Sequence, residues 1–241
     1  KMQRNETVLG FMAIPSEAPP ANLGSAPGQR VNGILWSAAS AANKNTWQDN
    51  NADRILFGAA RTNLVGGNFA SSLLNVDASA DRLSAASIGI MKWMAERASP
   101  AIEPLTTDDG YERYVMFVGS NAYRDAYRDP EIYAANRDAR PREGSRYKNN
   151  PIFMDGDLLY NGVIIRKVPQ IDALVTNAGA GAAGINVAPV FMCGKNALAW
   201  IWGQMPSATT LDETDYQFIK GVGIQMCYGV GKIASRPPGQ T

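Results

Sequence analysis

The side chains that could do chemistry in this chain are carboxylates, lysines and tyrosines, because its 241 residues include no histidine. Without histidine there is no Ser-His-Asp or Cys-His arrangement, no histidine-ligated metal and no imidazole to transfer protons near neutral pH. Carboxylate, lysine and tyrosine chemistry remain open in principle. The composition therefore favours a protein that is not an enzyme, and we expect no catalytic residues and no cofactor.

Two groups of acidic residues raise the question of a metal site. Asp155 and Asp157 flank a glycine in a turn-rich segment, but no further carboxylates follow at the spacing of a calcium-binding loop. Asp212, Glu213 and Asp215 follow a turn rich in proline and threonine, where a solvated loop before a strand explains them more simply. We expect a metal at neither place.

A glycine-rich run, Thr176–Gly184 (TNAGAGAAG), raises the question of a phosphate-binding loop. It lacks the Gly-Lys-Ser/Thr ending of a P-loop and does not lead into a convincing helix. We interpret it as a flexible loop tip.

Residues 124–148 combine many charges with tyrosines. The seven basic residues are Arg124, Arg128, Arg137, Arg140, Arg142, Arg146 and Lys148, and the five acids are Asp125, Asp129, Glu131, Asp138 and Glu143. The interleaved Tyr123, Tyr127, Tyr133 and Tyr147 could stack on bases. The mixed signs favour instead a solvated or subunit-contacting face with ion pairs. A net charge of +1 likewise gives no case for tight nucleic-acid binding.

Helices are predicted in two places. Ala80–Ala98 has apolar residues at helical spacing, with Asp77 and Ser79 as candidate N-caps and Pro100 as a stop. Further along the chain, Ser120 is expected to cap a helix that starts at Asn121, and Asp129 followed by Pro130 signals another start.

Buried strands are predicted from apolar, β-branched runs. Arg113–Gly119 is expected to be buried at Val115, Phe117 and Val118, and Leu158–Val168 to form one strand of about eight residues in which Gly162 marks a bend, a bulge or a close approach. Asn186–Met192 is predicted as another buried strand, which Cys193-Gly194 turns into the strand-like run Asn196–Trp202. Tyr216–Ile233 is predicted as two strands or one long bent strand, without an expectation of burial.

The N-terminal part is less regular. Val8–Ile14 is predicted as a short strand, and Pro15–Gln29 as irregular backbone that serves as a linker or as an arm ordered against a neighbouring subunit. Asp53–Ala59 is a short apolar run, and Thr62–Asp77 is expected to form a β-hairpin or extended loop around Gly66-Gly67.

Neither a membrane helix nor a secretory signal is expected, because no apolar run approaches the roughly 20 residues that a membrane helix needs. Cys193 and Cys227 lie in apolar strand-like runs, and we expect reduced thiols, with a disulfide left open. Because the chain begins with Lys1 rather than methionine, we expect it to be the mature or ordered part of a longer product.

Several segments carry a resemblance to a known family. NPIF, followed by an acidic glycine turn, then YNGVIIRKVP, MCGKNALAWIWGQ and DYQFIKGVGIQMCYGVGK occur in this order between Ala52 and Ala234. Together they resemble the major capsid proteins of tailed double-stranded-DNA phages, in particular the N-four-like phage capsid family. The resemblance implies an α+β fold of the Hong Kong 97 type, with a long spine helix, peripheral and axial domains, and an extended N-terminal arm.

The resemblance also implies a domain division. Residues 1–79 would form the N-terminal arm and projecting loop, with Thr62–Asp77 as part of that loop, and 80–109 the spine helix of the peripheral domain. Residues 110–205 would form the axial domain. Residues 206–241 would supply the returning strands of the peripheral domain and the C-terminal tail.

The implied function is self-assembly into pentamers and hexamers that close an icosahedral shell around packaged double-stranded DNA, without sequence-specific binding or a membrane. The implied partners are further copies of the chain, with scaffolding, decoration and portal proteins, in a virion capsid assembled in the host cytoplasm. The candidate subunit-interface residues are Arg124, Arg128, Arg137, Arg140, Arg142, Glu131, Trp200 and Trp202. Two alternatives stay open: an encapsulin-like nanocompartment shell, and a soluble α+β enzyme that uses carboxylates or tyrosine.

Overall fold

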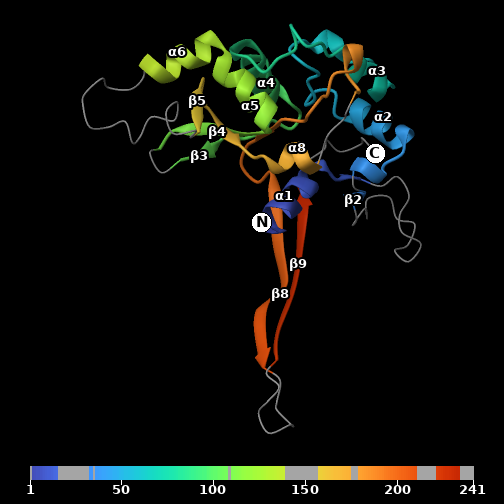
Figure 1. Ribbon diagram of the computed structural model, residues 1–241, viewed down its shortest axis with the longest axis vertical. Helices are drawn as coiled ribbons and strands as arrows, with labels where there is room; N and C mark the ends of the chain where they lie inside the picture. Colours follow the sequence, from blue (N-terminus) through green and yellow to red (C-terminus); the bar gives the residue numbers. More distant parts are fainter. Residues whose placement is uncertain are drawn as a thin grey trace.

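A body of helices around a small sheet carries a long, narrow β-hairpin that projects from one side (Figure 1). The computed structural model describes residues 2–15, 33–34, 36–107, 110–138, 157–174, 179–210 and 221–233. The helices within these ranges are α1 (Met2–Met12), α2 (Ala41–Asn50), α3 (Phe69–Leu74), α4 (Ala85–Arg97), α5 (Ser120–Arg128), α6 (Pro130–Asp138) and α8 (Gln170–Leu174), with 3-10 turns η1 (Trp36–Ala38), η2 (Arg61–Asn63) and η4 (Ala182–Gly184).

The strands form three separate sheets. They are β1 (Ile14–Pro15) and β2 (Gly33–Ile34), then β3 (Leu105–Thr106), β4 (Glu112–Val118), β5 (Leu158–Tyr160), β6 (Val163–Lys167) and β7 (Phe191–Cys193), and finally β8 (Leu198–Thr210) and β9 (Val222–Lys232). In the central sheet β4 pairs in parallel with β6, while β3 and β7 pair antiparallel to β4 and β5 antiparallel to β6. The chain between β4 and β6 includes the helices α5 and α6. It provides the long crossover connection that a parallel pair of strands needs.

Helices cover the central sheet on both faces. On one face, Met116 and Ile165 pack with Ile88 of α4 and Ile132 of α6 in the main core. On the other face, Phe117 lies in a smaller cluster with Val8 of α1 and Ile171 of α8. The expected burial of β4 at Val115, Phe117 and Val118 is therefore correct only for Val118. The alternate residues Tyr114, Met116 and Val118 are the buried ones, because successive side chains of a strand point to opposite faces.

The predicted strand Leu158–Val168 is two strands rather than one. Asn161 and Gly162 have positive φ angles of 48° and 75°, and they turn the chain back so that Leu158 pairs with Ile165. A two-residue Asn-Gly loop with both φ angles positive matches the right-handed twist of the strands that it joins. The bend expected at Gly162 is confirmed, but it is the turn of a hairpin.

Three helix starts test the capping predictions. Asp129 caps α6 as expected, since its Oδ1 accepts from the backbone N–H groups of Glu131 and Ile132. The helix predicted over Ala80–Ala98 is shorter and begins at Ala85, where Ser84 and Ser87 form a reciprocal capping box. Asp77 instead closes the preceding turn. Ser120 does not cap a helix but is the first residue of α5, which begins after Gly119.

Two predictions for the N-terminal part are wrong. Val8–Ile14 is mostly helical, as part of α1, because a helix there places Val8 against Ile171. Thr62–Asp77 holds η2 and α3 rather than a hairpin, because Asn68 uses its side chain to cap α3, accepting from the N–H of Ser71 at 3.0 Å. The turn expected at Gly66-Gly67 is present. Of the predicted arm Pro15–Gln29, only Pro15 is described, as the last residue of β1.

A second packed region lies beside the sheet and is built from α2, α3 and the loops around them. Its centre includes a buried polar pair, in which the Ser72 hydroxyl donates to Gln48 Oε1 and Gln48 Nε2 donates to the carbonyl of Val65. Polar groups buried in this way are stable because each finds a partner. The aromatic rings of Trp36, Trp47, Phe57 and Phe69 pack edge to face around it.

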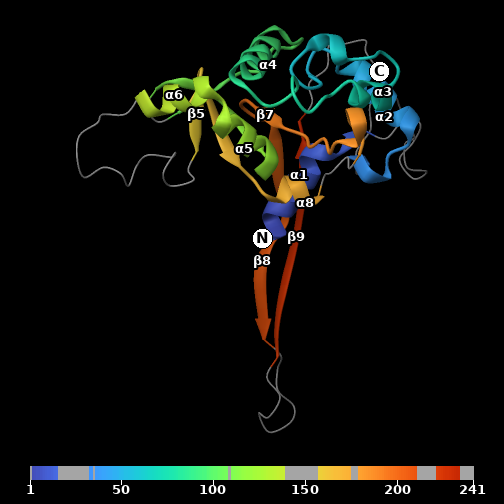
Figure 2. The same cartoon turned by 45° about the horizontal axis from the view of Figure 1, so that its top comes forward.

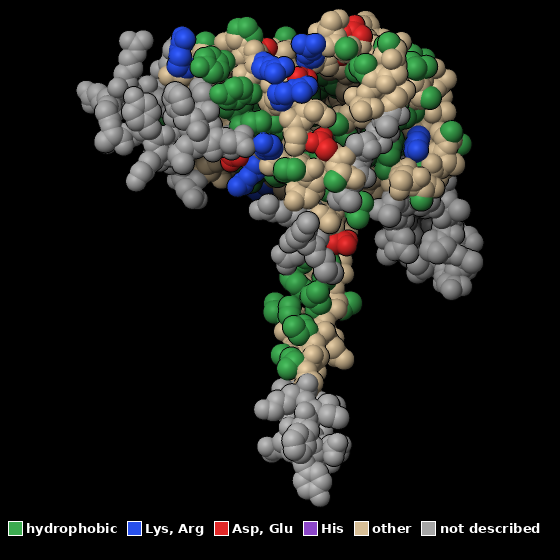
Figure 3. Space-filling model, viewed as in Figure 1, with side chains coloured by type: hydrophobic (Ala, Val, Ile, Leu, Met, Phe, Trp, Pro, Cys, Tyr) green, Lys and Arg blue, Asp and Glu red, His purple; other side chains and the backbone are tan. Residues whose placement is uncertain are grey.

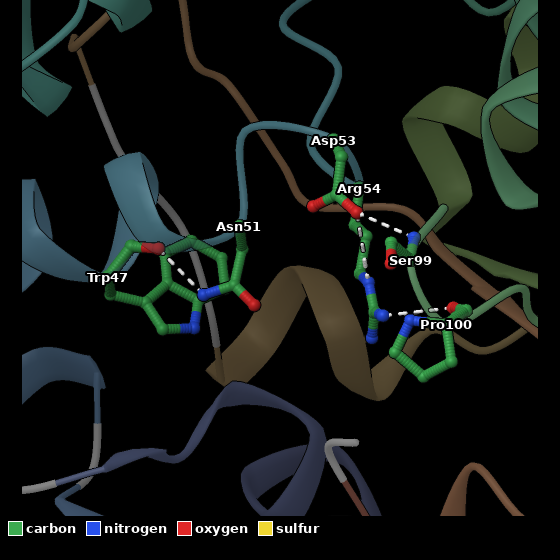
Figure 4. A network of polar contacts seen from close by, with 6 residues as sticks. All are labelled: Trp47, Asn51, Asp53, Arg54, Ser99 and Pro100. Carbon is green, nitrogen blue, oxygen red and sulfur yellow. Dashed lines mark hydrogen bonds and ion pairs between the residues drawn. The ribbon is translucent and has the colours of Figure 1, made fainter. Parts of the chain in front are cut away.

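Polar contacts join this second region to the end of α4 (Figure 4). The Asp53 carboxylate accepts from the N–H of Ser99 at 3.1 Å, and the Arg54 guanidinium donates to the carbonyl of Pro100 at 3.0 Å. Nearby, the Asn51 side chain donates to the carbonyl of Trp47 and so closes the end of α2. The side chains of Asp53 and Arg54, after α2, thus hold the backbone of Ser99 and Pro100, after α4.

The hairpin of β8 and β9 is the longest feature of the molecule (Figure 2). It confirms strand structure within Asn196–Trp202 and Tyr216–Ile233, the latter as a single strand over its described part. Its base rests on α1, where a Cβ on Gly10 would lie 3.0 Å from Val230 Cγ1. The strand predicted over Asn186–Met192 is shorter, and only Phe191–Cys193 is a strand of the sheet.

Candidate assembly surfaces

Four of the charged candidates, Arg124, Arg128, Glu131 and Arg137, lie on α5 and α6, which follow one another across one face of the sheet (Figure 1). Arg124, Arg128 and Arg137 are exposed, whereas Arg140 and Arg142 lie outside the described residues. The Arg124 guanidinium is 3.8 Å from Asp125, and the arginine side chain is exposed while the carboxylate is partly exposed, so this pair adds little to stability within the subunit. The exposed guanidinium groups can therefore meet carboxylates on another molecule.

Glu131, the acidic candidate, already has a partner within the subunit. Its carboxylate accepts a short hydrogen bond from the Tyr160 hydroxyl, which ties α6 to β5. This hydrogen bond raises the pKa of Tyr160 above its ordinary value, because the bond is lost when the phenol ionises. Glu131 thus fixes α6 against β5 within the subunit.

Of the described tyrosines of this region, Tyr123 is buried, Tyr127 is half-buried and Tyr133 is exposed, and each packs against other groups of the subunit. Tyr123 is buried in the main core, and the rings of Tyr127 and Tyr133 meet edge to face at 6.0 Å. Tyr147 lies outside the described residues. This packing supports the solvated or subunit-contacting interpretation of the charged stretch over the nucleic-acid one.

The two tryptophan candidates form a separate aromatic group at the base of the hairpin. Trp200 and Trp202 of β8 lie on the same face, and the Tyr228 ring of β9 stacks on Trp200 at 5.1 Å with an angle of 9° between planes. Trp202 contacts the same tyrosine at 5.7 Å. The rings are half-buried and stabilise the cross-strand pairing. The structure therefore divides the six described candidates between two surfaces.

The hairpin also carries exposed apolar residues that the sequence analysis missed. Val222 is 73% exposed, Ile224 71%, Ile201 66% and Met205 71%, and Met226 is partly exposed beside them. No residue of β8, and none of β9 before Lys232, is charged. In Figure 3 this projection shows only hydrophobic and uncharged side chains beyond the body. The sequence signal that could have identified this apolar surface is the lack of charged residues in two strand-like runs.

The ionisable groups of the described residues form no catalytic site. Burial raises the pKa of the Cys193 thiol to about 12, so this thiol is neutral and unreactive, while Cys227 on the hairpin is exposed. Backbone N–H groups of Ala80 and Ser79 hold the pKa of Asp77 below its usual value. Within the described ranges no three acidic or cysteine side chains are placed to hold a metal. Asp155 and the acidic run at 212–215 lie outside those ranges.

Comparison with known proteins decides among the alternatives. The phage capsid protein family matches residues 31–239. This chain belongs to that family. The solved capsid asymmetric unit of cyanophage Pam1 is 35% identical to it, with a TM-score of 0.79 over 97% of this chain and 61% of the other. No curated protein matches the chain.

A second phage capsid has the same fold. The capsid of Ralstonia phage GP4 aligns with a TM-score of 0.58 and 18% identity over 96% of this chain and 59% of that one. The α+β capsid fold expected from the sequence is thereby confirmed, and the capsid chain spans about three fifths of the length of these two relatives. In the part of the capsid protein that the structure describes, no helix is long and apolar enough to cross a membrane.

Proposed function

We propose that this capsid protein assembles as pentamers and hexamers into an icosahedral shell that encloses packaged double-stranded DNA. The observation that carries the proposal is the likeness to the cyanophage Pam1 capsid over 97% of the chain. The described residues support it chemically, because the β8–β9 hairpin exposes apolar side chains and α5 and α6 expose arginines, both of which are suited to contacts between subunits. Shell assembly in the host cytoplasm, scaffolding, decoration and portal partners, and contact with DNA that does not depend on base sequence belong to this proposal.

We also propose the domain division that the sequence resemblance implies. Residues 110–205 would form the axial domain, around β4, β6 and helices α5 and α6. Residues 80–109 and 206–241 would belong to the peripheral domain, with residues 1–79 as arm and projecting loop. The proposed peripheral domain would combine β9 with α4. Within the subunit, however, the helix that β9 mainly contacts is α1, so α1 joins the hairpin to the body.

Sedimentation and negative-stain imaging of the purified protein test the proposal. Closed shells of several hundred copies are expected, since contacts between copies of one chain close by symmetry. A particle of fewer than about ten subunits would contradict shell assembly. The content of particles from infected cells tests the enclosed genome: packaged nucleic acid supports the proposal, and particles that enclose only protein contradict it.

A further inference from the structure

An exposed tryptophan on α4 has two arginines over its ring. Trp93 is 43% exposed, and the guanidinium carbons of Arg61 and Arg97 lie 5.4 Å and 5.2 Å from the centre of the ring. Arg97 follows one turn later on α4, whereas Arg61 belongs to η2, so two elements meet at this side chain. We call these three residues the Trp93 cluster. An aromatic face attracts each cation, but the two arginines repel one another unless an anion joins them.

The described residues supply no anion to the Trp93 cluster. None of the ion pairs among them includes Arg61 or Arg97. Glu96 is the neighbour of Arg97 in the chain, but its carboxylate lies near Tyr114 of β4, whose pKa is raised first by burial and then by the charge of Glu96. The two exposed guanidinium groups can therefore donate to an anion from outside the subunit.

The geometry of the Trp93 cluster suits phosphate groups. A guanidinium that rests over an aromatic ring keeps N–H groups free along its edge, and this planar edge matches the oxygens of a phosphate. The distances from the ring centre limit the two guanidinium groups to a separation of about 11 Å, which covers about three successive phosphates of a DNA strand that rise ~3.4 Å each. One DNA strand can thus contact both arginines.

The Trp93 cluster lies on the side of the body that faces away from the hairpin. Both ribbon views place α4 at the end opposite the projecting β8–β9 hairpin (Figures 1 and 2). In the space-filling view, Lys and Arg side chains gather over this part of the body (Figure 3). A local basic patch attracts a polyanion even though the net charge of the chain is only +1.

We propose that the Trp93 cluster binds the phosphate backbone of the duplex DNA that the shell encloses. This proposal rests on the proposed function, because the shell brings DNA to many copies of the cluster at once. Arg61 and Arg97 donate to phosphate oxygens, and Trp93 positions both side chains. Phosphate contacts carry no sequence information, so the packaged sequence does not matter. Two contacts per subunit are weak alone and add up over many copies on one DNA molecule.

The salt dependence of DNA binding measures the phosphates that the Trp93 cluster contacts. Binding of the subunit to a fluorescent DNA duplex would be followed by anisotropy from roughly 10 to 100 mM salt, where exposed charges are least screened. Each phosphate contact adds about 0.9 to the slope of log affinity against log salt. We expect the double variant Arg61→Gln and Arg97→Gln to have a slope shallower by about 1.8 and to bind about tenfold more weakly.

Two further double variants provide the controls. Arg166→Gln with Lys195→Gln removes the same charge from exposed residues outside α4 and η2, and it should leave the slope unchanged. Arg61→Lys with Arg97→Lys keeps both charges but loses the planar groups that stack on Trp93. This variant should keep the slope and bind severalfold more weakly, which separates positioning by the ring from charge alone. Circular dichroism checks that each variant stays folded.

The outcomes separate this site from the shell. A slope that the loss of Arg61 and Arg97 leaves unchanged, or an equal change in the Arg166 and Lys195 variant, would overturn the site. Stronger binding of polyglutamate than of DNA would also overturn it and would indicate an acidic protein partner. Sedimentation of the same variants measures shell formation independently. Shells without this DNA contact contradict only the site, and DNA binding through the cluster by a protein that forms no shells contradicts only the shell.

Discussion

The Oδ2 atom of Asp172 accepts a hydrogen bond from the backbone N–H of Ser120 at 2.5 Å, so that a carboxylate from α8 stands at the first turn of α5. The residue before this turn is Gly119, whose hydrogen atoms leave the room that the carboxylate occupies. A helix N-terminus has unpaired N–H groups and a positive partial charge, and Asp172 meets both from a distant part of the chain. This contact fixes α5, and with it Arg124 and Arg128, against the sheet.

Removing this carboxylate should loosen α5. We expect Asp172→Ala to lower the free energy of unfolding by about 1 kcal/mol, the usual effect of losing a helix cap. Asp172→Asn keeps an oxygen acceptor and should lose less. Urea denaturation followed by circular dichroism measures both. Equal midpoints for Asp172→Ala and the wild type would show that water replaces the carboxylate without loss.

A side chain at Gly119 should be poorly tolerated. A Cβ there would lie 2.1 Å from Asp172 Oδ1, so Gly119→Ala must displace the carboxylate or the helix, and we expect a loss of about 1–3 kcal/mol. Gly89→Ala in α4 is the matched control. No atom lies within 4 Å of its added Cβ, and alanine in a helix should raise stability by about 0.5–1 kcal/mol. Thermal unfolding of the two variants should therefore shift in opposite directions.

Asp81 should be the most important acid of the loops between α2 and α4. Its carboxylate accepts from the N–H of Ala59 at 2.8 Å, the side chain of Asn63 at 3.0 Å and the N–H of Asp77 at 2.9 Å. We expect Asp81→Ala to cost about 2–3 kcal/mol, because three donors lose an ionised acceptor together. Asp49→Ala removes one exposed bond to Gly67 and should cost under about 1 kcal/mol. Similar unfolding midpoints for both variants would contradict this ranking.

Burial of Cys193 should make stability fall in alkali. Its folded pKa is about 12 against an ordinary value of 9.0, so between these pH values the thiol ionises in the unfolded chain and stays neutral in the folded one. The unfolded state is then favoured, and the free energy of unfolding should drop by up to about 1.4 kcal/mol per pH unit above pH 9. Cys193→Val lacks the titration. Denaturation at pH 8 and pH 10 should show a smaller drop for this variant, and parallel drops would contradict the assignment.

Charge reversal tests the basic residues of the charged stretch 124–148. Reversing Arg137 and Arg140 to Glu should impair assembly while the subunit stays folded, because like charges would then face each other across the contact. The double variant of Arg82→Glu and Lys195→Glu changes net charge equally at exposed residues away from α5 and α6. Sedimentation compares the two. Normal shells from the Arg137 and Arg140 variant would show that this face is merely solvated.

Local signals in the sequence predicted those elements whose ends depend on neighbouring residues. Asp129 and Pro130 start α6 as expected, because a cap and a preset φ angle act within one turn. The turn at Asn161-Gly162 also depends only on neighbouring residues, because an Asn-Gly pair is a strong signal for a hairpin. The prediction of a single strand did not use this signal. The alternation of side chains between the two faces of β4 likewise predicts a buried set of every second residue, which is Tyr114, Met116 and Val118.

Other features depend on contacts that sequence spacing does not encode. The segment from Val8 is helical because it lies between the sheet and Ile171, whereas its short apolar run alone suits a strand equally well. The cap of α5 comes from Asp172, 52 residues away. The charged candidates were identified because charged residues are frequent between 124 and 148. Their separation from Trp200 and Trp202 follows from the direction in which β8 leaves the body (Figure 1).

The parallel pairing of β4 with β6 has a consequence for the order of folding. The partners can meet only after the intervening polypeptide has formed α5 and α6, and such non-local pairing is slow. The β8–β9 hairpin is a local contact and forms quickly on the same scale. When the whole chain refolds, the hairpin, whose described residues carry no charge before Lys232, is therefore expected to form before the central sheet, and the yield of competent subunits should fall as the protein concentration rises.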